Sequence, residues 1–185
     1  MITKKNAQKL NKLMCKLNPG KELYHKAVMA NIDGREMQCM YLNFFIIGLY
    51  ERNEFIETSN DLDVANIVET YLTSKLPDEY DQISFDVEDI KAAINEYKER
   101  RTANMPLSCA VELNRKFYDA EYVLDILDVL TKRGGKLWWC QTTDIRRADY
   151  IETDNGIAVF CPMSQGAGDR AIHIPTKIID EVRKC

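Results

Sequence analysis

Lysines near the start of the chain could bind phosphate groups. They are separated by steps of four, three and four residues, with one more beside the first: Lys5, Lys9, Lys12 and Lys16, with Lys4 next to Lys5. Residues at these steps share one face of an α-helix, and no acidic residue interrupts the run. A row of ammonium groups suits the phosphates of DNA, although a solvated helix face is the plainer interpretation. The spacing therefore predicts a candidate DNA-binding surface.

A second predicted helix, from Tyr118 to Lys132, carries the opposite charge. Its acidic residues Glu121, Asp125 and Asp128 recur at steps of four and three. Its apolar residues form a separate stripe that we expect to be buried: Val123, Ile126, Leu127 and Leu130. If both helices faced one duplex, these carboxylates would repel its phosphates. The acidic face suits a partner protein or solvent better than DNA.

Residue types that perform catalysis or bind metals are sparse. His25 and His173 are the two histidines, and neither has the spacing of a metal site or a nucleophile motif around it. The six cysteines form no C-x-x-C pair, so we expect reduced and mostly structural thiols. We therefore expect a protein that is not an enzyme and needs neither a metal nor a cofactor.

The composition indicates one globular domain. The chain has 185 residues, 45% of them hydrophobic, and a formal net charge of −4, so it has no overall attraction for polyanions. Its start, MITKKNAQKLNKLM, lacks the apolar stretch of a secretory signal. The longest apolar run, residues 44–50, is too short to span a bilayer. We expect a cytoplasmic protein without a membrane partner.

The elements that must position these residues form two similar halves. Thr3 caps a helix that reaches about Leu17, and three strands follow over residues 22–32, 35–42 and 44–50. After Pro106 we expect a strand, the acidic helix and three more strands, over residues 107–113, 118–132, 136–142, 150–153 and 157–161. A helix followed by three strands thus occurs twice.

Residues 54–104 separate the halves and differ in composition. Between residues 54 and 99 there are thirteen Asp or Glu and three Lys. Apolar spacing predicts helices over 62–75 and 87–101, the second capped by Asp86, with a loop over 77–86 between them. We interpret this segment as an acidic helical insertion. Residues 164–185 form a C-terminal extension, with a short helix expected from about Pro175.

Residues 114–163 resemble the closing half of a domain of the bacterial DNA polymerase sliding clamp, the beta subunit. The resemblance rests on Asn114, the helix sequence Tyr122-Val123-Leu124-Asp125-Ile126-Leu127, the strand LWWCQTTD and the final AVFCPM. Residues 1–52 are similar more loosely. The resemblance implies an α+β, DNA-clamp-like single domain over residues 1–185, with two helices packed on antiparallel sheets. It also implies a role in DNA replication or its regulation, with both helices facing DNA.

In that family the last strand lines a hydrophobic groove, which takes short peptides from polymerases and other replication proteins. The matching positions in this chain are Val159, Cys161, Pro162 and Met163. The resemblance therefore implies that these four residues bind a partner peptide. The plainer alternative is that they are a core strand and its exit.

The chain also departs from the clamp family. A bacterial clamp subunit has three such domains, so a ring around DNA would require a homo-oligomer of this chain or another partner. The chain continues beyond Pro162-Met163, and residues 54–104 have no counterpart. One alternative is a small adaptor that keeps the clamp-like fold without a DNA role and binds partners through its acidic helices. Another is an enzyme of unrecognised type.

Overall fold

The computed structural model describes residues 2–73, 80–106, 108–131, 137–145, 147–163 and 171–179. In chain order its elements are α1 (Lys4–Leu17), the 3₁₀ turn η1 (Glu22–His25), β1 (Ala27–Ile32), β2 (Arg35–Tyr41), β3 (Phe45–Leu49), β4 (Thr58–Ser59), α2 (Leu62–Leu72), β5 (Tyr80–Phe85), α3 (Val87–Arg100), β6 (Ala110–Leu113), β7 (Lys116–Asp119), α4 (Ala120–Leu130), β8 (Leu137–Thr142), β9 (Asp149–Thr153), β10 (Gly156–Phe160), β11 (Ile172–Ile174) and β12 (Thr176–Ile178). The described fold is therefore α+β.

The strands form two sheets. The larger has the order β12-β5-β8-β9-β10-β3-β2-β1-β4, and the smaller has the order β11-β6-β7. Neighbouring strands are antiparallel except for β4 beside β1 and β11 beside β6. At the centre of the larger sheet β10 pairs with β3, so that β8-β9-β10 and β3-β2-β1 lie on either side of this pairing. The two halves expected from the sequence thus meet in one sheet.

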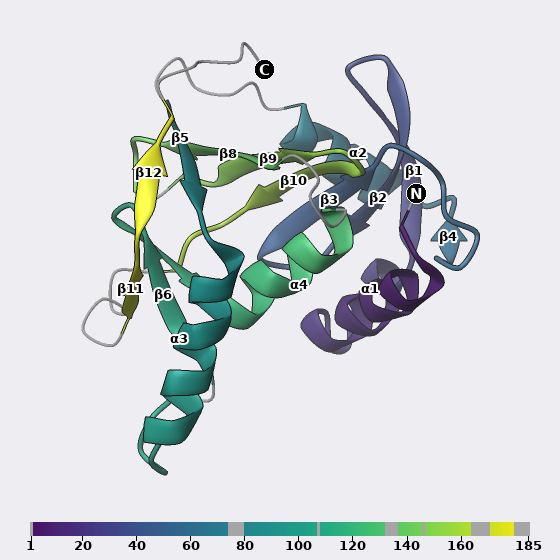
Figure 1. The fold of residues 1–185 in the computed structure, drawn as a ribbon. Coiled ribbons are helices and arrows are strands. Elements are labelled where there is room, and N and C mark those ends of the chain that lie inside the picture. The colour runs from purple at the N-terminus through teal and green to yellow at the C-terminus, as the bar shows by residue number, and fades with distance from the viewer. Residues whose placement is uncertain are drawn as a thin grey trace.

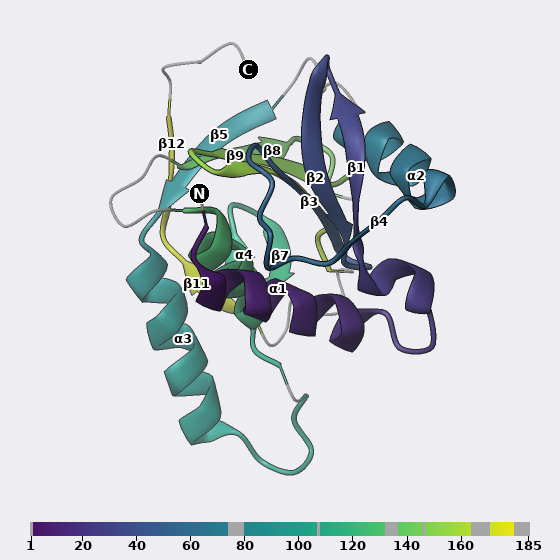
Figure 2. The ribbon, with the colours of Figure 1, turned by 90° about the vertical axis from the view of Figure 1, so that its right-hand side faces the viewer.

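Helices cover both faces of the larger sheet. Figure 1 shows α4 between α1 and α3 on one face, and their buried residues belong to the larger hydrophobic core. Figure 2 shows α2 on the other side of β1 and β2, where Val64, Val68 and Leu72 pack in a second core. The two acidic helices of residues 54–104 therefore lie on opposite faces of the sheet.

The helices begin at side chains that satisfy their free N–H groups. Thr3 accepts a hydrogen bond from the Asn6 amide at 3.2 Å, and Asp86 accepts one from the Glu88 amide at 2.9 Å. Both predicted caps are confirmed. The acidic helix begins at Ala120 and not at Tyr118, because Lys116–Asp119 form strand β7.

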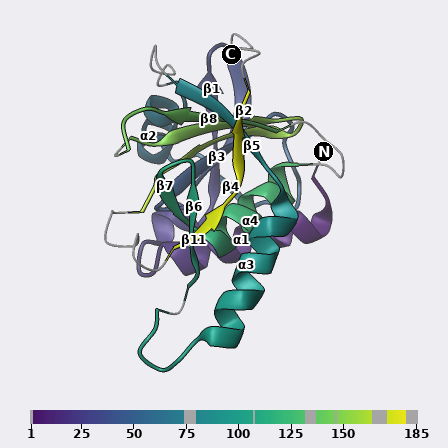
Figure 3. The same cartoon turned by 60° about the vertical axis from the view of Figure 1, so that its left-hand side comes forward.

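Two predictions for the segments around the edge of the sheet are wrong. The loop expected over 77–86 contains strand β5, which lies between β12 and β8. The helix expected from Pro175 is instead strand β12 over Thr176–Ile178, because its backbone pairs with β5. Figure 3 shows β11 and β12 running past β6 and β5. Residues 54–104 are thus built into the sheet and are not a purely helical insertion.

Strands β3 and β10 approach each other too closely for a side chain at Gly156. Gly156 pairs with Leu49, and a Cβ added to it would overlap the carbonyl oxygen of Gly48. The junction between the two halves of the sheet therefore requires glycine at this position.

Candidate functional site

A pocket of about 410 Å³ lies where the start of α4, the end of β10 and the turn before β3 meet. This volume is within the usual range for small-ligand pockets, about 300–1,000 Å³. Eight residues line it, and most of them are apolar or aromatic. They are Phe44, Ser108, Asp119, Tyr122, Phe160, Cys161, Pro162 and Met163. The pocket is thus apolar with one acidic residue in its wall.

Backbone hydrogen bonds fix two walls of the pocket. The Cys161 amide donates to the carbonyl of Phe44 at 2.9 Å, and the Met163 amide donates to the carbonyl of Phe117 at 2.7 Å. The segment that leaves β10 is therefore held against both the turn before β3 and strand β7. In that turn Asn43 has a φ of +60°, a left-handed conformation that asparagine tolerates well.

Apolar side chains at the rim of the pocket are accessible to water. Phe44 is 50% exposed and Met163 is 39% exposed. Tyr122 lies between the pocket and helix α1, because its ring stacks with that of Phe44 at 6.3 Å and Lys16 Nζ lies 5.7 Å from its centroid. Exposed apolar groups beside a concavity are typical of binding surfaces.

Asp119 forms the acidic part of the wall. One carboxylate oxygen caps α4 by accepting hydrogen bonds from the amides of Glu121 at 3.0 Å and Tyr122 at 3.2 Å. Burial raises the pKa of the Asp119 carboxyl above its ordinary value, although these amides and Ser108 lower it in part. The carboxylate is therefore incompletely solvated where it lines the pocket.

Phe160 connects the pocket to a rigid layer of aromatic side chains. Its ring lies 5.5 Å from that of Tyr118 and 6.0 Å from that of Trp139. Both of these residues donate hydrogen bonds to Asp149, Trp139 through Nε1 at 2.9 Å. Because this network fixes the rings beneath Phe160, the floor of the pocket is preorganised.

Asp149 is also paired with a buried lysine. Lys116 Nζ lies 2.6 Å from its carboxylate, and their side chains are 2% and 0% exposed. The same ammonium group donates to Thr142 Oγ1 at 2.7 Å and to the carbonyl of Arg147 at 3.0 Å. All three ammonium protons thus have acceptors, so the pair joins β7 to the strands of the larger sheet.

Three of the four residues that the clamp resemblance assigned to peptide binding line this pocket. They are Cys161, Pro162 and Met163. Val159 does not line it, because successive strand residues face opposite sides and Val159 packs against the second core. Sequence reasoning missed the remaining wall, although the aromatic residue that follows Asn43 was a usable signal.

The predicted lysine stripe lies on the outer face of α1, where part of it is neutralised. Lys9 Nζ lies 2.7 Å from Asp125 and 3.1 Å from Asp128, both on the neighbouring helix α4. Burial lowers the pKa of Lys9, but its hydrogen bonds to the two carboxylates raise it overall. Two of the three acids that were expected to oppose DNA binding thus pair directly with the centre of the stripe.

The other stripe lysines are exposed. Lys4 Nζ lies 4.9 Å from the ring centroid of Phe55, and Lys16 lies over Tyr122. Lys5 and Lys12 form no ion pair within the part of the chain that the structure describes. Positive charge therefore remains on both sides of Lys9, at Lys4 and Lys5 and at Lys12 and Lys16.

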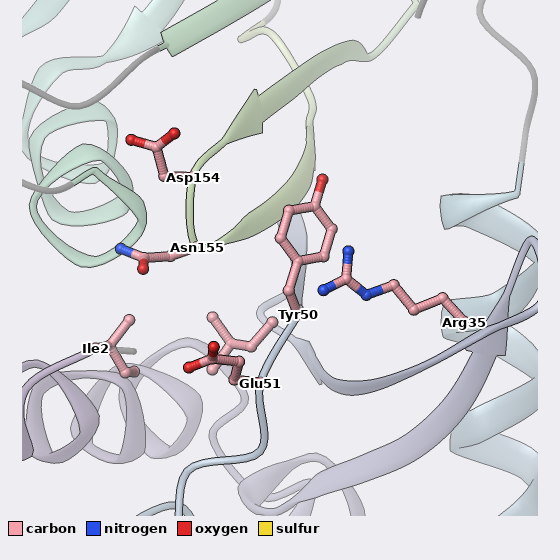
Figure 4. Close-up of a pocket in the computed structure, with 7 residues that line it drawn as sticks. Ile2, Arg35, Tyr50, Glu51, Asp154 and Asn155 are labelled. Carbon is pink, nitrogen blue, oxygen red and sulfur yellow. The ribbon is translucent and has the colours of Figure 1, made fainter.

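Figure 4 shows a second, smaller pocket, in which the Arg35 side chain lies beside Tyr50. Its volume is about 80 Å³, and Ile2, Glu51, Asp154 and Asn155 are also in its wall. The Arg35 guanidinium lies 3.8 Å from the Tyr50 ring centroid, a close cation–π contact. This pocket has room for a few water molecules and is too small for a peptide.

The residues that could bind metals are dispersed in the described part of the fold. Among residues 2–73, 80–106, 108–131, 137–145, 147–163 and 171–179, no three His, Cys, Asp or Glu side chains gather as metal ligands. Four of the cysteines within these ranges are free thiols: Cys15, Cys39, Cys109 and Cys161. Cys185 lies outside the described residues.

Protein-family models, curated proteins and solved structures provide no match to this chain. No helix in the described residues is long and apolar enough to cross a membrane. The candidate site therefore rests on the geometry of the pocket and on the chemistry of its walls.

The thiols should differ in reactivity according to their environment. In native protein treated with iodoacetamide at pH 8, Cys15 should react first, because it is exposed. Cys161 should react more slowly, because desolvation raises the pKa of its thiol. Burial raises the pKa of Cys39 to about 12 and that of Cys109 to about 11, so both should stay unmodified. Peptide mass mapping measures each site.

Urea provides the control for this order of reactivity. Once the chain is unfolded, the four thiols should react at similar rates, because their environments become alike. Modification of Cys39 at the rate of Cys15 in the native protein would contradict the burial on which the prediction rests.

Proposed function

We propose that this protein is a non-catalytic, clamp-like module that binds a short segment of a partner protein in the pocket between Phe44, Tyr122 and residues 161–163. The observation that carries the proposal is an apolar pocket of about 410 Å³ whose rim exposes Phe44 and Met163 to water. Covering such groups with apolar side chains releases water and is favourable. The clamp resemblance makes the partner a replication protein.

The arrangement of the two halves supports the clamp-like part of the proposal. Each half contributes one helix, α1 or α4, and three consecutive strands to the same sheet. The two helices lie side by side on one face, and the halves join by antiparallel pairing of β3 with β10. Two helices packed on an antiparallel sheet is the arrangement that the resemblance implies.

The geometry supports a protein partner more strongly than DNA. A duplex that approached α1 would also meet Asp125 and Asp128 of α4, which already occupy Lys9. Phosphates would have to displace these carboxylates to use the middle of the stripe. For the adaptor alternative, acidic helix α2 lies on the opposite face of the sheet from α3 and α4, so the three acidic helices cannot all belong to one binding surface.

Selection from a displayed library of random nine-residue peptides tests the proposal. The best peptide, labelled with fluorescein, should bind wild-type protein in an anisotropy titration. Phe44→Ala and Met163→Ala should each weaken its affinity about tenfold or more, because both remove apolar contact area from the rim. Both side chains are partly exposed, so the variants should remain folded.

Leu62→Ala is the matched control for these truncations. Leu62 is 76% exposed on α2, on the other face of the sheet, so its loss should leave the affinity unchanged. Occupancy of the pocket should also slow alkylation of Cys161 and leave Cys15 unaffected. Selected peptides that tolerate both rim substitutions would show that this pocket is not the binding site.

A further inference from the structure

The wall of the pocket contains a negative charge that lacks a cationic partner within the described chain. Asp119 lines the pocket, and no Lys or Arg among the described residues forms an ion pair with it. Nearby acids on the same helix differ in this respect, because Glu121 lies 3.6 Å from Lys98 Nζ and Asp125 lies 2.7 Å from Lys9 Nζ. Asp119 is thus the uncompensated charge of this region.

Apolar surroundings make that charge a recognition feature. Asp119 shares the pocket with the rings of Phe44, Tyr122 and Phe160, and its side chain is half-buried. A cation is attracted more strongly to a partly desolvated carboxylate than to one in bulk water, because less water screens the two charges from each other. The geometry of the α4 cap holds the group in place, so a ligand would not need to order it.

The cations that the structure describes around the pocket do not fill this role. Lys16 Nζ lies over the ring of Tyr122, and within the described residues it forms no ion pair with Asp119. Arg115 lies beside Asp81, and Lys98 lies beside Glu121. No cation among the described residues therefore pairs with Asp119, and a molecule that enters the pocket can supply one.

We infer that the bound segment of the partner combines apolar side chains with a lysine or arginine, and that this basic residue pairs with Asp119 while the apolar side chains cover Phe44 and Met163. The inference rests on the proposed function and specifies the chemistry of its ligand. An acidic segment would place like charges together at Asp119. A purely apolar one would cover the carboxylate and leave its negative charge without a cation, which is unfavourable.

Asp119→Asn separates the charge from the structural role of the residue. Asparagine caps helices about as well as aspartate, so the variant should keep its thermal midpoint. Selection of random nine-residue peptides on wild-type protein should enrich Lys and Arg over the library, whereas selection on Asp119→Asn should not. Asp63→Asn removes the same charge from the exposed surface of α2, so its selected peptides should resemble those of wild-type.

A titration of matched peptides provides the quantitative test. The best wild-type binder is remade with its basic residue replaced by glutamine. The replacement should weaken binding to wild-type about tenfold, the effect expected of one charge-assisted hydrogen bond, and should weaken binding to Asp119→Asn less than twofold. Equal losses on both proteins would overturn the inference.

The two proposals fail in different ways. Peptides that bind wild-type, depend on Met163 and show no enrichment of basic residues would overturn the inference and leave the proposed function intact. Failure to obtain any peptide that depends on Phe44 or Met163 would overturn both. If Asp119→Asn lowered the thermal midpoint, the same peptide selections and titrations would be made with Asp119→Ser, because serine also caps α4 without a charge.

Discussion

Lys116→Met should lower the free energy of unfolding by about 3–5 kcal/mol at pH 7.5. The substitution leaves the Asp149 carboxylate buried, with a 0% exposed side chain and no counter-ion among its described neighbours. Trp139 and Tyr118 still donate hydrogen bonds to it, but neither neutralises its charge. Urea unfolding followed by tryptophan fluorescence measures the loss.

The same variant should lose less stability in acid. Burial already raises the pKa of Asp149, against the lowering effect of Lys116, so removal of Lys116 raises the pKa further. A carboxyl whose pKa is raised on folding contributes stability below its unfolded pKa of about 3.9, and this contribution is lost as pH rises through the folded value. The deficit relative to wild-type should therefore be smaller at pH 4.5 than at pH 7.5.

Lys26→Met is the matched control for the buried pair. Lys26 Nζ lies 3.6 Å from Glu57, but both side chains are more than half exposed. Water screens such a pair, so its loss should change stability by less than about 0.5 kcal/mol. A deficit for Lys116→Met that is equal at both pH values would contradict the role assigned to the Asp149 charge.

Gly156→Ala should destabilise the fold by about 3 kcal/mol, near the upper end of overpacking effects. The added methyl would overlap the carbonyl oxygen of Gly48, and it would come within 3.1 Å of the Leu49 Cα. Both atoms belong to backbone that pairs with β2 as well as with β10, so β3 cannot move aside without weakening two ladders. The thermal midpoint by circular dichroism measures the effect.

Gly48→Ala tests whether backbone contact causes this loss. Its new methyl would come within 2.8 Å of Met37 Cε and 3.2 Å of Leu72 Cδ1, the ends of flexible side chains. These side chains can move, so we expect a smaller loss of about 1 kcal/mol. If both variants lost the same stability, the close approach of the two strands would not explain the glycine at position 156.

Local signals predicted the helices well. Thr3 and Asp86 were identified as caps because capping depends on residues within one turn, and the apolar spacing of each helix lies within the same short stretch. Strands β8, β9 and β10 were predicted to within one residue at their starts, since each is a short run rich in apolar, aromatic or β-branched residues next to turn signals. Information of this kind requires no knowledge of distant neighbours.

The edge strands could not be identified in this way. Tyr80–Phe85 contains two buried residues, Gln82 and Ile83, and one of these is polar. Its neighbours in sequence are acidic, so its composition resembles a loop, and pairing with β8 and β12 makes it a strand. Once β5 was missed, β12 had no visible partner, and Pro175 was interpreted as the start of a helix.

The candidate site was predicted in part. Residues 161–163 came from the clamp resemblance, whereas Phe44 and Asp119 reach the same pocket from distant parts of the chain. Phe44 was expected to start a buried strand, but the left-handed turn at Asn43 exposes it. Lys116 and Asp149 are also far apart in sequence, and nothing local identifies them as a pair.

The pairing of β3 with β10 has a consequence for how the protein is made. The two strands are roughly a hundred residues apart, and a ribosome adds about 5–20 residues per second. For several seconds, therefore, the emerging chain carries the apolar strand Phe45–Leu49 without its partner. An unpaired apolar strand can associate with other chains, so we expect that chaperone supply during translation limits the yield of this protein.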